Sequence, residues 1–187
     1  MNSKSKNETI KILIAGEGGQ GVQAIGKILS ETGFEAGLSV SFIPNYGVEQ
    51  RGGVTIAFIQ FRKNREIIYP KFLEADIIVW LSQRSIKRTE QYLYNKSLVI
   101  YNSKFIANLK NPKYIRINFD QLANDIGSHR STNMIVLGFL LQHLKTWIDI
   151  KYAKKIINHK FAKYYKINPN LKKQNDKALD IGYNLKM

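Results

Sequence analysis

The stretch from Ile10 to Val22 constrains the fold more than any other part of the chain. It begins with a short apolar run, Ile10 to Ala15, of the kind that forms a buried β-strand. Four glycines follow at once, and apolar residues then recur at helical spacing: Gly16, Gly18, Gly19 and Gly21, then Val22, Ala24, Ile25, Ile28 and Leu29. Strand, tight turn and helix in this order are typical of the start of an open α/β sheet. The helix would present unpaired N–H groups at the turn, which suit an anion or a carbonyl.

The glycine-rich turn has several possible functions. Gly16, Gly18 and Gly21 fit the dinucleotide fingerprint G-x-G-x-x-G, which also needs an acidic residue about 20 positions further on, at the end of the second strand. The second apolar stretch, residues 38–44, contains no Asp or Glu, which disfavours NAD(P). No Lys-Ser/Thr pair follows the glycines, so a P-loop is excluded. A turn that only packs helix against sheet, a site for another ligand, and a contact for a partner chain's backbone remain open.

Composition narrows the class of protein. The 187 residues carry 29 Lys and Arg against 14 Asp and Glu, a net charge of +15. The lysines are spread along the chain, with one enrichment at residues 145–187. These lysines fall on helical patterns, so we interpret them as a solvated helix face, or as a contact for an acidic partner subunit, rather than as a nucleic-acid site. The chain has no cysteine, which removes disulfides, cysteine nucleophiles and cysteine-ligated iron–sulfur clusters. The three histidines show no metal-ligand spacing and are interpreted as packing or surface residues.

No apolar run reaches the length of a membrane span, and the polar N-terminus shows no signal peptide, so we expect a cytoplasmic protein without membrane contact.

The remaining patterns predict these elements: strands at 38–44, 54–61, 66–69, 76–82, 97–101 and 114–118, and helices at 22–36, 85–94, 120–126, 133–147, 150–165 and 171–182. The strands at 54–61 and 66–69 are predicted to form a hairpin. The helix at 133–147 is apolar on nearly every side and is therefore expected to be buried.

These elements predict one α/β domain over residues 1–187, with residues 1–9 disordered. The expected fold is a Rossmann-like open mixed sheet, mostly parallel with a β-hairpin, with helices on both faces. Two glycine-rich loops would follow the first two strands of this sheet. If those strands are parallel neighbours, both loops lie at the same edge and form one surface.

Several segments together resemble one protein family. They are GEGGQGV in the first turn, Tyr46-Gly-x-Glu-x-Arg-Gly-Gly53 after the second strand, Ile67-x-x-Pro70, and the closing Asn175-x-x-Ala178-x-x-x-Gly182. The chain is similar over nearly its whole length to the gamma subunit of 2-oxoacid:ferredoxin oxidoreductases, the equivalent of one domain in the single-chain pyruvate enzyme. The form YGVEQRGG resembles the 2-oxoglutarate and branched-chain members more than the pyruvate members. Indolepyruvate or pyruvate enzymes, and a free-standing nucleotide-binding module, are the alternatives.

The resemblance implies an accessory subunit of a complex that converts a 2-oxoacid to an acyl-coenzyme A, with ferredoxin as electron acceptor. Its cofactors, thiamine diphosphate, Mg and 4Fe-4S clusters, would be held by other chains, and coenzyme A would bind within the complex. The partners would be alpha, beta and ferredoxin-like delta subunits, with no nucleic acid. Glu17 and the hairpin turn Arg62-Lys-Asn-Arg65 depart from the family pattern, and a carboxylate at position 17 disfavours an anion at the first turn.

Two groups of residues are candidates for binding, and no catalytic or metal-ligating residue is assigned. The first group is a turn for a phosphate or a partner's backbone: Gly16, Gly18, Gly19, Gln20 and Gly21. The second is a subunit interface or coenzyme A contact: Tyr46, Gly47, Glu49, Arg51, Gly52 and Gly53. Arg51 is the main candidate because its fork of donors suits a carboxylate or phosphate. An ion pair with Glu49 that stiffens the loop is the alternative, and Gln20 is expected to cap the helix or donate to a partner carbonyl.

Overall fold

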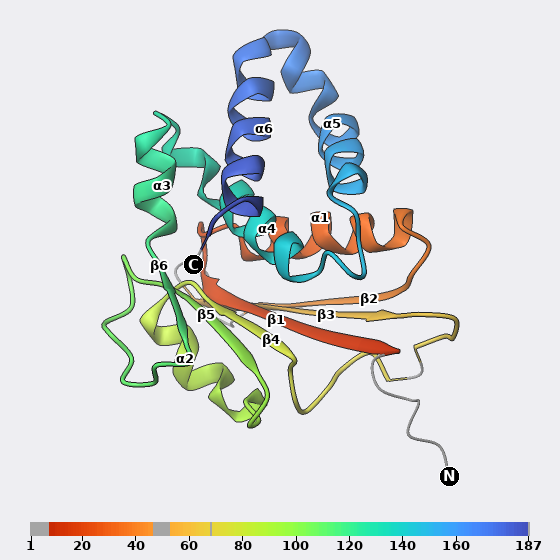
Figure 1. Cartoon of the computed structure of the whole chain (residues 1–187), viewed down its shortest axis with the longest axis vertical. Helices are drawn as coiled ribbons and strands as arrows, with labels where there is room; N and C mark the ends of the chain where they lie inside the picture. The colour runs from red at the N-terminus through yellow and green to blue at the C-terminus, as the bar shows by residue number, and fades with distance from the viewer. Residues whose placement is uncertain (1–7, 47–52, 68, 187) are drawn as a thin grey trace.

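The computed structural model describes residues 8–46, 53–67 and 69–186. Six strands in this part of the chain form one sheet in the order β2-β3-β1-β4-β5-β6 (Figure 1). Their bounds are β1 (Thr9–Glu17), β2 (Ser39–Asn45), β3 (Val54–Arg62), β4 (Ile77–Trp80), β5 (Leu98–Asn102) and β6 (Ile115–Ile117). β1, β4, β5 and β6 pair in parallel, whereas β3 is antiparallel to both β1 and β2. The predicted mixed sheet is therefore confirmed.

The predicted hairpin has a different partner strand. β3 pairs with β2 on one side, Val40 opposite Phe61, and with β1 on the other, Ile12 opposite Ile59. Both of its edges are occupied, so no edge is left for a return strand after it. The prediction of a strand at 66–69 is wrong for Glu66, Ile67 and Tyr69, and residue 68 lies outside the described residues.

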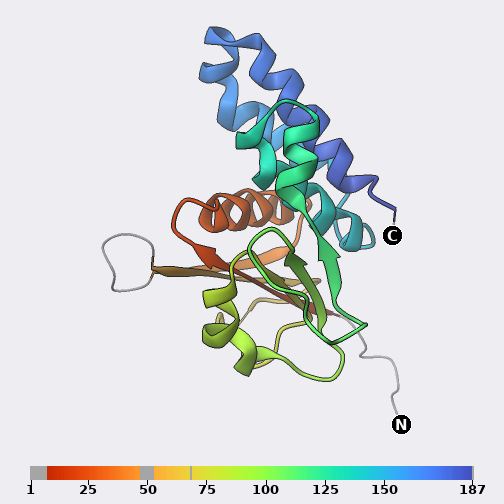
Figure 2. The ribbon, with the colours of Figure 1, turned by 90° about the vertical axis from the view of Figure 1, so that its left-hand side faces the viewer.

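Helices cover both faces of the sheet, as predicted, but unequally (Figures 1 and 2). α1 and α4 lie over one face with α3, α5 and α6 around them, and α2 lies on the other face. The bounds are α1 (Val22–Glu35), α2 (Gln83–Thr89), α3 (Phe119–Asp125), α4 (Thr132–His143), α5 (Ile150–Ile167) and α6 (Pro169–Tyr183), with short 3₁₀ turns η1 (Glu90–Tyr92) and η2 (His129–Ser131). α5 and α6 form a hairpin whose free end projects away from the sheet.

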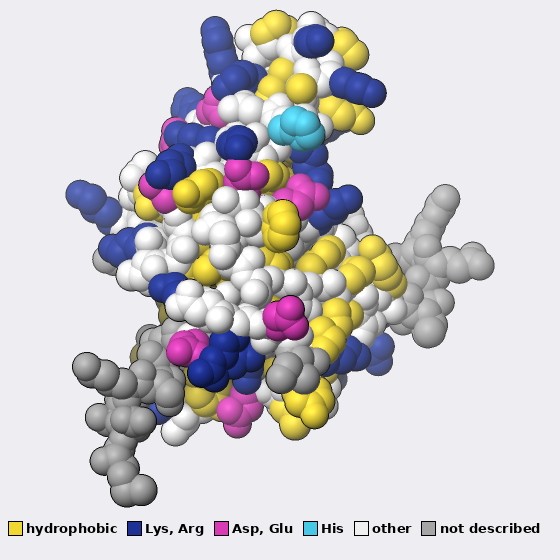
Figure 3. Space-filling view, turned by 90° about the vertical axis from the view of Figure 1, so that its right-hand side faces the viewer, with side chains coloured by type: hydrophobic (Ala, Val, Ile, Leu, Met, Phe, Trp, Pro, Cys, Tyr) yellow, Lys and Arg dark blue, Asp and Glu magenta, His cyan; other side chains and the backbone are white. Residues whose placement is uncertain are grey.

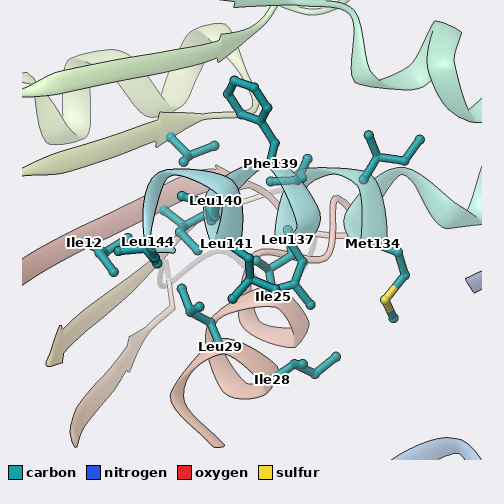
Figure 4. Packing of buried hydrophobic residues seen from close by; sticks show 14 of the residues in the cluster. Ile12, Ile25, Ile28, Leu29, Met134, Leu137, Phe139, Leu140, Leu141 and Leu144 are labelled. Carbon is teal, nitrogen blue, oxygen red and sulfur yellow. The ribbon is translucent and has the colours of Figure 1, made fainter. Parts of the chain in front are cut away.

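The main core lies between the sheet and α4. Leu137, Leu140 and Leu141 of α4 are fully buried, and they pack with Ile25 and Leu29 of α1 (Figure 4). This confirms that the nearly all-apolar helix is buried. α4 ends at His143 rather than at the predicted Trp147. Its last turn is tightened, with the N–H of Leu144 shared between the Leu140 and Leu141 carbonyls, and the chain then turns to bury Ile148.

Several helix ends lie where their capping residues predict. Gly37, with φ of 82°, follows α1, and the Asp149 side chain accepts from the N–H of Lys151 at the start of α5. Thr9 lies in β1, and the Glu8 carbonyl accepts from the N–H of Lys63. These two residues are therefore ordered, and the first strand begins nearer the N-terminus than predicted. No helix in the described ranges is both long and apolar enough to cross a membrane.

Candidate functional site

The glycine-rich turn after β1 uses its glycines in different ways. Gly19 and Gly21 have positive φ, 94° and 77°, a conformation that other residues rarely adopt. Gly18 has no positive φ; its N–H instead donates to the Gly53 carbonyl at 3.2 Å. Gly16 is packed so closely that an added Cβ would lie 2.7 Å from Gln20 Oε1. The sequence therefore folds into a tight turn in which Gly16 and Gly18 contact other residues of the same chain.

Gln20 fastens this turn to the neighbouring strand. Its Oε1 accepts from the N–H of Glu17 at 2.7 Å, and its Nε2 donates to the carbonyl of Leu81, just after β4, at 3.0 Å. The side chain therefore does not cap α1, so that expectation is wrong, whereas a bond from Gln20 to a partner's carbonyl stays a prediction. The reason is that two backbone groups of the same chain lie within its reach once β1 and β4 are paired.

The stems of the second glycine-rich loop meet the first turn. Gly53 is buried and accepts from Gly18, while Gln23 of α1 donates through Nε2 to the Ile56 carbonyl at 3.1 Å and to the Asn45 carbonyl at 3.5 Å. Tyr46 begins the loop and is 64% exposed. The other predicted residues of this loop lie outside the described residues: Gly47, Glu49, Arg51 and Gly52.

The turn after β1 and the stem of the second loop at Gly53 meet at one edge of the sheet, for a different reason from the predicted one. β1 and β2 run in the same direction but are not neighbours, because β3 lies between them. The chain returns from β2 directly into antiparallel β3, whose first residue, Val54, lies opposite Glu17 at the end of β1. The hairpin connection thus delivers Gly53 to the carboxyl end of β1.

A cavity of about 400 Å³ opens at the carboxyl ends of β1, β4 and β5. The residues that line it are Gly19, Gln20, Gly21, Leu81, Asn102, Phe105, Asp120, His129, Arg130, Thr132 and Asn133. After β1 the chain enters α1 on one face of the sheet, and after β4 it enters α2 on the other face. Such a switch point is where open α/β sheets bind ligands. The cavity therefore lies where the fold alone favours a binding site.

The cavity brings together the starts of two long helices. Gly21 is the N-cap of α1 and Ser131 is the N-cap of α4, and neither residue makes a side-chain capping bond. The two starts adjoin, since a Cβ on Gly21 would lie 3.1 Å from Asn133 Cβ. Arg130 is exposed and forms no ion pair with any described residue. Helix N-termini and a guanidinium both favour a negatively charged group.

The carboxylate in the cavity is already engaged. Asp120 accepts from Asn102 Nδ2 at 2.7 Å and pairs with Lys104 Nζ at 3.3 Å. His129 contacts Asn124 Oδ1 through Nδ1, which holds its ring near α3. Asp120 is thus partly neutralised, and Arg130 remains the cation available to an anionic ligand.

Several of these cavity residues were not predicted. Asn102, Asp120, Arg130 and Asn133 come from segments with no glycine motif, and His129 was interpreted as a packing or surface residue. Asn102 is the last residue of β5, a position that could have been marked as a candidate from strand ends alone. Arg130 and Asn133 reach the cavity only because α4 packs against α1, which no local pattern indicates.

The side chains that line the cavity are suited to binding a polar or anionic ligand. In the described part of the chain, no three His, Cys, Asp or Glu side chains gather where they could hold a metal ion. The cavity offers hydrogen-bond donors, one cation and one aromatic ring, Phe105, which is 44% exposed. Such a set can recognise an anionic or polar ligand and fix its orientation.

Comparisons with known proteins agree over most of the chain. The indolepyruvate oxidoreductase subunit IorB of Archaeoglobus fulgidus is 26% identical, over 94% of this chain and 94% of its own length. The ketoisovalerate oxidoreductase subunit VorA of Methanothermobacter thermautotrophicus is also 26% identical, over 84% of this chain but only 33% of its own length. The chain thus spans nearly all of one relative and about a third of the other.

Solved structures share the fold. A chain of the 2-oxoglutarate:ferredoxin oxidoreductase from Magnetococcus marinus, with 2-oxoglutarate, coenzyme A and succinyl-CoA bound, matches with a TM-score of 0.82 and 21% identity, over 95% of this chain and 31% of that one. The gamma subunit of a keto/oxoacid ferredoxin oxidoreductase from Geobacter sulfurreducens matches with a TM-score of 0.74 and 21% identity, over 93% of this chain and 96% of that one. The family profile described as pyruvate ferredoxin/flavodoxin oxidoreductase matches residues 11–185, and the chain therefore belongs to that family.

Proposed function

We propose that this chain is the gamma-type subunit of a 2-oxoacid:ferredoxin oxidoreductase complex. The observation that carries the proposal is the family match over residues 11–185, joined to a fold that brings both glycine-rich segments to one end of the sheet. The complex would oxidise and decarboxylate a 2-oxoacid and pass the electrons to ferredoxin, with an acyl-coenzyme A as product. Alpha, beta and ferredoxin-like delta subunits would be its partners.

The residues of this chain do not fit the redox and thiamine cofactors of such a complex. Iron–sulfur clusters are held by cysteine thiolates, and the sequence contains no cysteine. A magnesium–diphosphate site needs oxygen ligands that converge on one ion, and the described residues offer no such cluster. Partner subunits would therefore hold the thiamine diphosphate, the magnesium and the clusters, and this chain would assist as a binding and assembly element.

Coenzyme A is the substrate whose chemistry fits the candidate site. Its phosphate groups are anions, and the cavity combines two helix starts with the unpaired Arg130. Arg51, in the neighbouring loop, would add a second guanidinium. We propose that the end of the sheet bearing both loops faces the thiamine-binding subunits, with coenzyme A or a partner carboxylate between them.

The 2-oxoacid is proposed to be 2-oxoglutarate, on the form of the loop YGVEQRGG. The relatives support the class of substrate more than one member of it, since their names include indolepyruvate and ketoisovalerate enzymes. Indolepyruvate and pyruvate are therefore the alternatives. Every one of these substrates is a 2-oxoacid, so the choice among them leaves the proposed reaction unchanged.

A free-standing dinucleotide-binding module is the second candidate, and one feature of the sheet disfavours it. The fingerprint G-x-G-x-x-G works with an acidic residue at the end of a parallel strand beside β1. Here antiparallel β3 occupies that place, and β2 ends in Pro44 and Asn45. No carboxylate from β2 is therefore available for the ribose hydroxyls.

The test is purification from the native source with a tag on this chain, followed by mass spectrometry and an assay of 2-oxoacid-dependent ferredoxin reduction. Stoichiometric recovery of thiamine-binding and iron–sulfur subunits, with activity that requires coenzyme A, is the expected result. Assays with 2-oxoglutarate, indolepyruvate, ketoisovalerate and pyruvate identify the substrate. A chain that purifies alone and binds NAD(P) or FAD tightly would support the second candidate instead.

A further inference from the structure

The free end of the α5–α6 hairpin, residues 162–173, is here called the hairpin tip. It lies in a strongly basic part of the chain: residues 150–175 contain eight lysines and no Asp or Glu. Every residue of the tip except Tyr165 and Leu171 is exposed. Figure 1 shows the tip as the part of the molecule furthest from the sheet. The tip thus carries positive charge well away from the candidate site.

Ion pairing becomes sparse toward the tip, where one lysine, Lys172, pairs with Asp176 of α6 at 2.6 Å. Nearer the sheet, Lys160 pairs with Glu31 of α1 at 2.9 Å and Lys154 pairs with Asp180 of α6 at 2.7 Å. At the tip, three lysines form no ion pair with any described residue: Lys163, Lys166 and Lys173. The carboxylates of α1 and α6 thus neutralise the base of the hairpin and leave the tip cationic.

The tip also exposes apolar side chains. Ile167, the last residue of α5, is 84% exposed, and Tyr164 is 61% exposed. Figure 3 shows lysine and hydrophobic side chains interspersed at the free end of the hairpin. An apolar centre with a charged rim is the usual anatomy of a protein–protein interface.

The tip is held in one shape before any partner binds. The Tyr165 hydroxyl accepts from Asn175 Nδ2 of α6 at 3.0 Å, and the Tyr165 ring stacks on Phe161 with centroids 5.9 Å apart. Asn168 caps α6 through the N–H of Asn170, with Pro169 at the first helical position. A preorganised element loses little conformational entropy on docking.

We propose that the hairpin tip docks on an acidic surface of another subunit of the complex, with Ile167 in an apolar pocket and Lys163, Lys166 and Lys173 against carboxylates. This inference rests on the proposed function for the identity of the partner. It concerns the free end of the α5–α6 hairpin, which projects away from the sheet that carries the glycine-rich turn. Charge complementarity selects the partner, because the tip offers three unpaired cations and no anion.

Other occupants fit the tip less well. A second copy of this chain would bring two cationic tips together, which costs binding energy. A membrane surface would gain little from two exposed apolar side chains on a turn, because stable binding needs a larger apolar face. Nucleic acid is bound by extended basic grooves with stacked aromatic rings, and the tip is a convex turn without arginine.

The experiment compares two triple variants of the full chain in the co-expressed complex. Lys163→Gln, Lys166→Gln and Lys173→Gln remove the three unpaired charges of the tip and leave Lys172, which pairs with Asp176. The matched control removes the same charge from three exposed positions outside the hairpin: Lys87→Gln, Lys96→Gln and Lys113→Gln. A third variant, Ile167→Ser, removes the apolar anchor. Dissociation of this chain from its partners is measured by native mass spectrometry at increasing NaCl.

We expect the tip variant to dissociate with a Kd raised by at least about tenfold at low salt and with a flatter salt dependence, since rim charges act through screened electrostatics. Ile167→Ser should weaken the complex at every salt concentration, and the control should match wild type. A tip variant that behaves like the control overturns this inference alone. A wild-type chain that joins no thiamine-binding or iron–sulfur subunit overturns the proposed function, and with it the partner named here. Tip-dependent binding of phosphatidylserine vesicles or duplex DNA, with assembly unchanged, would assign the tip to those ligands.

Discussion

Gly138 of α4 and Gly182 of α6 lie at the point where the two helices cross with their backbones almost in contact. A Cβ on Gly138 would lie 2.1 Å from the carbonyl oxygen of Leu179, and a Cβ on Gly182 would lie 2.0 Å from that of Ile135. Neither position has room for a methyl group, and the obstacle on each side is backbone rather than a flexible side chain. This crossing attaches the hairpin of α5 and α6 to the domain core.

Gly182→Ala should therefore destabilise the protein although alanine favours helices. Overpacking costs about 1–3 kcal/mol and more when backbone must move, which exceeds the gain of about 1 kcal/mol in helix propensity. Urea unfolding followed by circular dichroism measures the difference. Lys177→Ala, exposed on the same helix, is the control and should change the free energy of unfolding by less than about 0.5 kcal/mol. Equal stability of Gly182→Ala and wild type would show that the crossing is looser than the structure indicates.

The closing motif shows what sequence could and could not predict here. Asn175, Ala178 and Gly182 were recognised as a family signature and placed on a helix, which is correct. Their purpose depends on contacts between helices: Asn175 bonds to Tyr165 of α5, Ala178 is fully buried and Gly182 meets α4. Periodicity indicates that a helix has a buried face, but it does not indicate which element lies against that face.

The pairing of Gly16 with Gln20 yields a second prediction. Gly16→Ala should displace the Gln20 side chain, because the new Cβ would lie 2.7 Å from its Oε1. Gln20→Ala loses the bonds to Glu17 and Leu81, at a cost of about 1–3 kcal/mol because two part-buried backbone groups lose their partner. Since both changes disrupt the same two bonds, the double variant should be less destabilised than the sum of the single variants.

Thermal unfolding of the four proteins gives the coupling energy of this cycle. Some cost of Gly16→Ala should persist in the double variant, because Leu81 and Val22 also crowd the position at 3.0 Å. Fully additive effects would mean that Gln20 does not fasten the turn in solution.

The candidate site was predicted unevenly. Both glycine-rich segments were recognised, because turn chemistry is local and only glycine adopts positive φ at Gly19 and Gly21 without strain. The cavity residues Asn102, Asp120 and Arg130 were not, because they come from three separate elements, β5, α3 and η2, which converge only when the chain has packed. The position of β3 between β1 and β2 was likewise missed, since strand order is a long-range property and the alternation of apolar residues is local.

Leu137→Asp should severely destabilise the protein. Leu137 is fully buried in α4, and an unpaired carboxylate there costs several kcal/mol unless it becomes protonated. Its melting temperature should fall far below that of Lys145→Asp, a control at an exposed position just beyond the same helix. An unchanged melting temperature for Leu137→Asp would contradict the assignment of α4 to the core.

The isolated chain should be colourless and free of iron, and should show no oxidoreductase activity. The reason is that it contains no cysteine to ligate a cluster. Visible absorbance spectroscopy and iron analysis of the purified chain check this, with the reconstituted complex as the positive control. Stoichiometric iron with a broad absorbance band in the isolated chain would contradict it.

Arg51→Ala should lower turnover or weaken assembly of the complex while it leaves the isolated chain nearly as stable as wild type. Arg51 itself lies outside the described residues, but the loop that carries it begins at exposed Tyr46 and ends at Gly53, whose carbonyl accepts from Gly18. If Arg51 binds a phosphate or a partner carboxylate, Arg51→Lys should restore only part of the function, because a lysine keeps the charge and loses the paired donors. If Arg51 instead forms a local pair with Glu49, the change costs at most about 1 kcal/mol of stability, and Glu49→Gln should reproduce it. The coenzyme A concentration that gives half-maximal rate distinguishes the two possible ligands of Arg51. If Arg51 binds a phosphate of coenzyme A, Arg51→Ala raises this concentration. If Arg51 binds a partner subunit, Arg51→Ala leaves this concentration unchanged and raises the Kd of assembly. Wild-type values for both quantities would remove Arg51 from the proposed surface.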